Sequence, residues 1–227
     1  MSDTEEQDIP LGTSIRRHSF RLGLFAFGAA LLLALISNGT AQRIEAQRAA
    51  AELEALNAVL PQASHDNDLL SDSFIISPAA ESFEQAALLG LSTPRSAYVA
   101  RMAGEPVGVI LPLEAPDGYS GTIVLLIGLD ASGEITGVRT LQHTETPGLG
   151  DKIELRKSDW ILTFDNRSLA NTDPLLWRVK KDGGEFDQFV GATITPRAVV
   201  GAIYNALLFF EANRTALFNH VTEGSNP

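Results

Sequence analysis

The chain has 227 residues, 44% of them hydrophobic, so it can form the core of one ordinary domain and carry an additional segment. It contains no cysteine, which excludes disulfides, thiol nucleophiles and cysteine-ligated iron–sulfur or zinc sites. The four histidines are scattered, so no metal site is expected. The formal net charge of −11 opposes contact with phosphate backbones, and nucleic acid is not an expected partner.

The first predicted element is an uncharged stretch of 21 residues, 22–42. Its most apolar part is shorter than the roughly 20 residues of a spanning helix, although flanking residues can extend it. The stretch is compatible with a cleaved signal peptide or with a retained anchor. We favour an anchor with a transmembrane helix over residues 20–41, because residues 41–60 read as uninterrupted helix as far as Pro61.

Basic residues around this stretch set its expected orientation. Arg16, Arg17 and Arg21 precede it, whereas Arg43 and Arg48 follow it, which favours a cytoplasmic N-terminus. The predicted organisation is a cytoplasmic N-terminus (1–19), a transmembrane helix (20–41), a juxtamembrane helix with a linker (42–73) and a periplasmic domain (74–227).

The next part of the chain alternates short apolar runs with turn residues. Residues 81–90 predict a short helix, and residues 96–113 predict a hairpin whose second strand ends or lies at an edge at Pro112. A continuous apolar run, 122–129, predicts a buried strand, and residues 135–143 predict its partner.

The C-terminal part predicts further helices. After the loop 144–150 we expect a helix over about 151–164, then a hairpin within 175–189 across the turn sequence KDGG. A helix over 196–212 follows. Its apolar stripe comprises Val199, Ile203, Ala206, Leu207 and Phe210. The predicted fold class is α+β, an antiparallel sheet flanked by helices and preceded by one N-terminal transmembrane helix.

Common enzyme motifs are absent from the sequence. No G-x-G-x-x-G stands in a strand–helix unit, so direct NAD binding is not expected. There is no Walker loop, no G-x-S-x-G and no S-x-x-K, so hydrolase chemistry finds no support and no catalytic residue is predicted.

The loop HTETPGLGDK, residues 143–152, has two interpretations. It is either an ordinary Gly/Pro loop with Asp151 as a cap, or a rigid loop whose backbone approaches a flat ligand because Gly148 and Gly150 lack side chains. We expect His143, at the end of a strand, to have a structural role.

The stretch GATITPR contains two threonines just before a helix. Pro196 suits the first helical position, which makes Thr195 the expected N-cap and leaves the Thr193 hydroxyl free. Thr193 would then face the positive end of the helix, where an anion is favoured, and Arg197 would suit a phosphate there. The alternative is a plain junction between a loop and a helix.

Two motifs give the chain a family resemblance. DQFVGATITPRAVV resembles the flavinylation motif of the G subunit of the Rnf electron-transport complex, a membrane-bound ferredoxin–NAD oxidoreductase. HTETPGLGDKI resembles the second conserved block of that family. The family pattern D-x-x-[ST]-G-A-T runs from Asp187 to Thr193, with Val190 in place of the usual Ser or Thr. A related motif occurs in the C subunit of the sodium-pumping NADH:quinone reductase.

The resemblance implies an FMN attached to Thr193 through a phosphoester bond. It also implies a separate flavin transferase that uses FAD and recognises Asp187. The residues expected to contact FMN besides Thr193 are Glu145, Thr146, Gly148, Leu149, Gly150, Gly191, Ala192, Thr195 and Arg197.

The function implied is an electron-relay subunit of an ion-translocating complex in the bacterial inner membrane, with other integral subunits as partners. The chain would contribute to an oxidoreductase as a subunit; whether it is an enzyme in isolation stays open. The alternatives are the corresponding subunit of the sodium-pumping quinone reductase, a cofactor-free extracytoplasmic scaffold, and a secreted flavin carrier if residues 1–41 are cleaved.

Overall fold

The structure is a computed structural model that describes residues 11–78 and 83–219. Within this part, the side chains of residues 11–17 and 34–45 and of Arg48 lie outside the description. The chain divides into two compact units, residues 1–50 and residues 51–227, which are described separately.

In the first unit, the described residues 11–50 belong to the long helix α1 (Leu11–Val59); the last turns of α1, from residue 51, belong to the second unit. Apolar side chains such as Phe20 and Phe25 are exposed on it. Among the residues that the structure describes, no helix is both long and apolar enough to cross a membrane. Part of the predicted transmembrane helix (34–41) has side chains outside this description, as do residues 1–10 of the predicted cytoplasmic N-terminus. The expected uninterrupted helix up to Pro61 is confirmed, since α1 ends at Val59.

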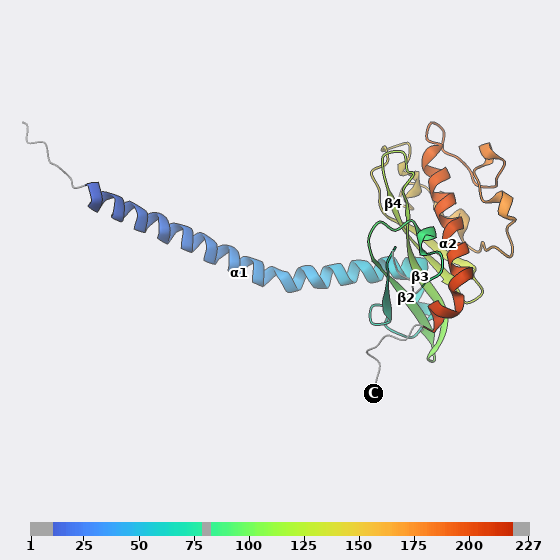
Figure 1. Cartoon of the computed structure of the whole chain (residues 1–227), viewed down its shortest axis with the longest axis horizontal. Helices are drawn as coiled ribbons and strands as arrows, with labels where there is room; N and C mark the ends of the chain where they lie inside the picture. The colour runs from blue at the N-terminus through green and yellow to red at the C-terminus, as the bar shows by residue number, and fades with distance from the viewer. Residues whose placement is uncertain (1–10, 79–82, 220–227) are drawn as a thin grey trace, which may run out of the picture. The chain divides into compact units, whose positions relative to one another are not determined.

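The second unit is built on a five-stranded antiparallel meander (Figure 1). The strands pair in sequence order: β1 (Ser73–Ile76), β2 (Arg95–Met102), β3 (Glu105–Ala115), β4 (Ile123–Asp130) and β5 (Ile135–Gln142). The predicted hairpin is β2–β3, and the continuous apolar run is the buried strand β4. With helices beside this sheet, the α+β class is confirmed.

The expectation for Pro112 was partly wrong. Strand β3 does not end there but continues to Ala115, with Pro112 opposite Leu126 of β4. The register of β2 against β3 begins only at Ile110. Pro112 therefore lies where β3 has a ladder partner on one side alone, and its missing N–H breaks no ladder there.

One face of the sheet is covered by helix α2 (Ile194–Phe218), which lies along β3 (Figure 1). The whole predicted stripe of α2 is buried against the strands. The helix extends six residues beyond the predicted end because Asn213 is buried and bonds the backbone of Glu84, with N–H to Oδ1 at 2.7 Å and Nδ2 to the carbonyl at 2.8 Å. The helix expected over 81–90 is only the short 3-10 helix η2 (Ala86–Leu89), which packs beside α2 and has Gly90 as its C-cap. Residues 81–82 of that prediction lie outside the described residues.

The other face of the sheet receives the last turns of α1. Leu56, Val59 and Leu60 form a second cluster there with Tyr98, Ile110 and Leu126, among other residues. Glycines permit the close approach: a Cβ on Gly128 would lie 2.4 Å from the Val59 carbonyl oxygen, and one on Gly137 would lie 2.9 Å from it. The Thr136 hydroxyl donates to the same carbonyl at 2.6 Å. The sheet therefore has an apolar layer on both faces.

Two predictions for the segment after β5 were wrong. The expected helix over 151–164 is two short 3-10 helices, η3 (Asp151–Ile153) and η4 (Asp159–Phe164), because Ser158 is extended and caps η4 by accepting from the Trp160 N–H. The expected hairpin within 175–189 is absent. In its place lie the 3-10 helices η5 (Pro174–Leu176) and η6 (Lys180–Asp182) and one parallel bridge, Val179 to Phe186.

The physical reason for the missing hairpin is aromatic packing. Trp177 and Phe186 are buried with ring centroids 5.3 Å apart, and Phe186 stacks on Phe164 at 4.6 Å. Burying these rings in one cluster is worth more than the ladder of an exposed two-stranded hairpin.

Candidate functional site

The two sequence motifs meet at a pocket of about 300 Å³ between the loop 144–150 and the start of α2. This pocket is at the lower limit of the roughly 300–1,000 Å³ typical of small-molecule sites. Ten residues line it: Tyr119, Glu145, Thr146, Leu149, Gly150, Gly191, Ala192, Thr193, Ile194 and Thr195. The structure thus brings together all of the predicted FMN contacts except Gly148 and Arg197.

Aromatic residues hold the segment that carries Thr193 on its buried side. Phe186 and Phe189 are buried, and the indole Nε1–H of Trp160 donates to the Asp187 carbonyl at 2.7 Å. A turn follows in which the Ala192 N–H bonds the Phe189 carbonyl at 3.1 Å and Gly191 adopts φ +83°. Since positive φ strains other residues, glycine is required there for the chain to turn into the pocket.

The outer side of the same segment is open. The side chain of Val190 is 90% exposed, and Asp187 is exposed with its carboxylate 2.7 Å from the Lys180 Nζ. An exposed ion pair of this kind contributes about 0–1 kcal/mol to stability, so it does little to hold the segment. The segment is therefore anchored through Phe186 and Phe189 and accessible through Asp187 and Val190.

The helix begins two residues earlier than predicted, and the expected N-cap role of Thr195 was wrong. Thr193 occupies the N-cap position with helical backbone angles (φ −79°, ψ −26°), and its hydroxyl makes no capping hydrogen bond. Thr195 lies inside the first turn, fully buried, and its hydroxyl donates to the Glu145 carboxylate. Pro196 did not reveal the earlier start of the helix, because a residue without an N–H is tolerated at any position of the first turn.

Glu145 is the polar centre of the pocket wall. It is 4% exposed, its Oε1 accepts from the Ser120 N–H at 2.9 Å, and its Oε2 accepts from Thr195. A Cβ on Gly150 would lie 2.8 Å from that Oε2, so a side chain at position 150 would displace the carboxylate. This close approach explains one glycine of the loop.

The loop 143–151 is held by its own hydrogen bonds. The Thr146 carbonyl accepts from Leu149 and Gly150, and the Gly148 N–H donates to Asp151 at 2.8 Å. Gly148 has φ +78° and an open surrounding, so it serves the turn and does not line the pocket. The loop is a compact Gly/Pro turn, as in the first interpretation, but Gly150 and not Asp151 occupies the cap position of η3. The approach of the loop backbone to a flat ligand stays a prediction.

His143 has structural contacts, as expected. Its Nδ1 accepts from the Glu145 N–H at 3.1 Å, and its Nε2 lies 2.7 Å from the Glu154 carboxylate. Arg156 also bonds Glu154, and these hydrogen bonds lower the pKa of Glu154 to about 2, Arg156 having the larger effect. His143 thus fixes the start of the loop.

Arg197 does not line this pocket. Its guanidinium makes two hydrogen bonds with Asp182, at 2.6 and 2.9 Å, and lines a neighbouring hollow with Glu114 and Asn205. This pairing lowers the pKa of Asp182. We expected Arg197 to face a phosphate at Thr193, but its guanidinium is bound to Asp182 and does not line the pocket.

Sequence reasoning missed two lining residues. Tyr119 comes from the turn after β3 and is 66% exposed, and Ile194 follows Thr193 with 45% exposure. The only available signal for Tyr119 was an aromatic residue between two glycines in GYSG. Both residues add apolar surface at the mouth of the pocket.

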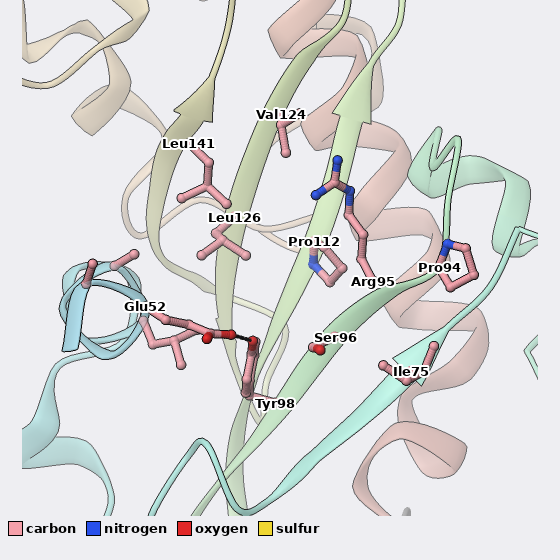
Figure 2. A pocket seen from close by; sticks show the side chains of 13 residues that line it. Glu52, Ile75, Pro94, Arg95, Ser96, Tyr98, Pro112, Val124, Leu126 and Leu141 are labelled. Carbon is pink, nitrogen blue, oxygen red and sulfur yellow. Dashed lines mark hydrogen bonds between the residues drawn. The ribbon is translucent and has the colours of Figure 1, made fainter. Parts of the chain in front are cut away.

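A larger hollow of about 520 Å³ lies on the sheet face that receives α1 (Figure 2). Figure 2 shows Glu52 of α1 directed at Tyr98 of β2, whose hydroxyl donates to it. Burial, followed by Glu52, raises the pKa of Tyr98. Arg95 is bound to Glu114, 2.8 Å from Nε to the carboxylate. No predicted site residue lies in this hollow, and its charged groups already have partners.

Metal binding finds no support in the structure. Within residues 11–78 and 83–219, no group of three His, Cys, Asp or Glu residues is placed to hold a metal ion.

Comparison with known proteins relates this geometry to a family. The FMN-binding domain family matches residues 118–208, which include every residue that lines the pocket, and the RnfG N-terminal region matches residues 1–59. The G subunit of the ion-translocating oxidoreductase complex from Shewanella loihica is 46% identical over 206 residues, covering 91% of this chain and 94% of that protein. The chain belongs to the RnfG family. The family resemblance drawn from the two motifs is therefore confirmed.

A second relative agrees with the assignment to RnfG. The G subunit of the same type of complex from Pseudomonas aeruginosa is 50% identical over 204 residues, covering 90% of this chain and 92% of the other. Among solved structures, NqrC from Shewanella oneidensis is 19% identical, with a TM-score of 0.43 over 70% of this chain and 71% of that chain.

Proposed function

We propose that this chain is an electron-relay subunit of an Rnf-type, ion-translocating oxidoreductase complex and that it carries FMN attached through a phosphoester to Thr193. The observation that carries the proposal is the position of the Thr193 hydroxyl. It lines the pocket at the start of α2, makes no capping hydrogen bond, and lies within the stretch that matches the FMN-binding domain family.

The residues present fit a flavin phosphate at this position. The first N–H groups of α2, from Ile194 and Thr195, have no partner within the helix and favour an anion. Tyr119, Leu149 and Ile194 offer apolar surface for a flat ring. FMN supplies the chemistry that side chains lack, because it accepts and passes on electrons one or two at a time.

A phosphoester would tether the flavin at the end remote from its ring. The pocket residues would then orient the ring, and the tether would keep its local concentration high without tight non-covalent binding. Such a relay converts no bound substrate, so the absence of a catalytic constellation in the sequence is expected.

Maturation would require a flavin transferase that recognises Asp187. Support comes from the exposure of Asp187 and Val190, which leaves the outer side of the motif free for an enzyme to contact. The buried Phe189 of the motif and the preceding Phe186 would hold Thr193 in place meanwhile.

We further propose that the chain is a single-pass protein of the bacterial inner membrane. Residues 1–19 would lie in the cytoplasm, the helix 20–41 would span the bilayer, and the domain from residue 74 would be periplasmic. Support comes from the uncharged stretch 22–42 and from the exposed apolar side chains of α1, including Phe20 and Phe25. Resistance to alkaline extraction, together with protease digestion of intact spheroplasts, tests both the anchor and its orientation.

Other integral subunits of the complex would be the partners. The relatives are by name subunits of an ion-translocating oxidoreductase complex, so the chain would act within an oxidoreductase and would not bind NAD itself. Membership of the RnfG family favours this complex over the sodium-pumping quinone reductase.

The experiment that tests the proposal is the intact mass of the protein purified from membranes of a strain that has the transferase. We expect the mass of one FMN, less water, on the peptide that contains Thr193. Thr193→Val should abolish it, whereas Thr193→Ser, which retains a hydroxyl, should retain part of it. An unmodified wild-type protein would favour the cofactor-free scaffold, and a missing N-terminal segment would favour the secreted carrier.

A further inference from the structure

Glu145 is a buried carboxylate in the pocket wall whose hydrogen-bond donors are both neutral. It accepts from the backbone N–H of Ser120 at 2.9 Å and from the hydroxyl of Thr195. The neighbouring Lys157 lies 3.6 Å from Asp151, and the His143 ring bonds Glu154. In the part of the chain that the structure describes, Glu145 forms no ion pair, so its charge is not neutralised in place.

Three separate segments of the chain are shaped around this carboxylate. They are the turn that contains Ser120, the loop 144–150 and the first turn of α2. Close glycines complete the enclosure, because a Cβ on Gly118 would lie 3.1 Å from Oε1 and one on Gly150 would lie 2.8 Å from Oε2. An enclosed carboxylate is expensive for stability. A neutral glutamine could accept from Ser120 through its oxygen and donate to the Thr195 hydroxyl through its amide, without the penalty for burying a charge. We therefore infer that the negative charge of Glu145 has a function in the pocket.

We propose that Glu145 is a tuning residue: it lowers the reduction potential of the flavin bound at Thr193, and Thr195 positions it for this purpose. The inference rests on the proposed function. Uptake of two electrons and one proton by the oxidised ring leaves one negative charge, whereas uptake of two electrons and two protons leaves none. The electrons come from a reduced redox centre of a partner subunit, and the protons come from solvent.

A fixed negative charge near the ring disfavours the reduced form that carries one negative charge. It therefore makes the ring harder to reduce. The effect is appreciable because water is largely excluded around Glu145, and charges interact more strongly at low dielectric. Thr195 acts through Glu145, because its hydroxyl holds one carboxylate oxygen in the wall of the pocket.

The test compares full-length, flavinylated proteins after intact mass has established one FMN on each. Spectroelectrochemical titration at pH 7 then gives the midpoint potential. In Glu145→Gln we expect the ratio of reduced to oxidised flavin, poised at the wild-type midpoint, to rise at least tenfold, which is about 30 mV for a two-electron couple. Glu105→Gln removes the same charge from an exposed position in the β2–β3 hairpin and should leave the potential unchanged.

Two further variants separate charge from structure. If Glu145→Gln does not fold, the double variant Glu145→Met with Thr195→Val replaces both members of the Glu145–Thr195 hydrogen bond by apolar groups, an exchange that is often nearly neutral for stability. The other donor, the Ser120 N–H, belongs to an exposed residue. The double variant should show the same tenfold rise. Thr195→Ser, which keeps the donor, should retain the wild-type potential.

The outcomes are distinguishable from those of the proposed function. An unchanged potential in a fully flavinylated protein that lacks the Glu145 charge overturns the tuning role but leaves FMN attachment intact. A wild-type protein without flavin on Thr193 overturns the proposed function, and the tuning role with it.

Discussion

Thr195 donates its hydroxyl to Glu145, fifty residues earlier in the chain, and both side chains are buried. This hydrogen bond joins the loop 144–150 to the first turn of α2. It also separates the tasks of the two threonines, because Thr195 is committed to the loop and Thr193 is left at the N-cap position without a capping bond. The free hydroxyl at the pocket is thus a consequence of where Thr195 is bound.

Thr195→Val should destabilise the protein measurably. The change preserves shape but leaves one oxygen of a buried carboxylate without its donor, which typically costs about 1–3 kcal/mol. Thermal unfolding of the full chain should show a lower midpoint, while Thr195→Ser should stay close to wild type. If Thr195→Val were as stable as wild type while Thr195→Ser lost stability, packing of the threonine methyl would matter and the hydrogen bond would not.

The glycines beneath the end of α1 provide a second prediction. In Gly128→Ala the new Cβ would lie 2.4 Å from the Val59 carbonyl oxygen, a contact that only a backbone shift can relieve. Overpacking of this kind costs about 1–3 kcal/mol. Chemical denaturation should show a lower free energy of unfolding.

Gly201→Ala is the matched control. Gly201 lies in α2 with nothing within 4 Å of its Cβ position, so alanine should stabilise the helix by about 0.5–1 kcal/mol. If Gly128→Ala were as stable as wild type, the close approach of α1 to the sheet would be contradicted.

Much of the fold was predictable because its signals are local. The apolar run of β4, the glycine and proline turns and the stripe of α2 each follow from the period of a single element. The pocket was predictable in the same way, since each of its two motifs is contiguous in sequence and the family resemblance linked them.

The remaining features depend on contacts between distant residues. Thr195 was expected to cap α2 but donates its hydroxyl to Glu145 instead, and no local sequence pattern predicts a partner so far away. Trp177 and Phe186 read as strand residues, but their rings are buried in a shared aromatic cluster. Tyr119 entered the pocket from a turn whose position depends on the whole sheet.

Acid should weaken the contact that fixes the start of the loop. Arg156 and His143 lower the pKa of Glu154 from 4.5 to about 2, so their stabilising effect is fully present above pH 4.5 and is lost as the pH falls towards 2. The difference in unfolding midpoint between wild type and Glu154→Gln should be largest above pH 4.5 and vanish near pH 2. A difference that persists unchanged to pH 2 would show that Glu154 acts through packing alone; Glu105→Gln is the control for loss of an exposed charge.

Val190→Thr tests whether the residue type at position 190 affects incorporation of FMN, independently of the stability of the fold. Val190 is 90% exposed and contributes little to packing, so the change should alter the free energy of unfolding by less than about 0.5 kcal/mol. It restores the residue type usual in the family pattern, so we expect faster incorporation of FMN when purified protein is incubated with transferase and FAD. Asp187→Asn, also at an exposed position of the same motif, should slow incorporation and change stability by no more than about 1 kcal/mol, the upper value for an exposed ion pair. If Val190→Thr left the rate unchanged while Asp187→Asn abolished modification, recognition would rest on the carboxylate of Asp187 and position 190 would be only a spacer.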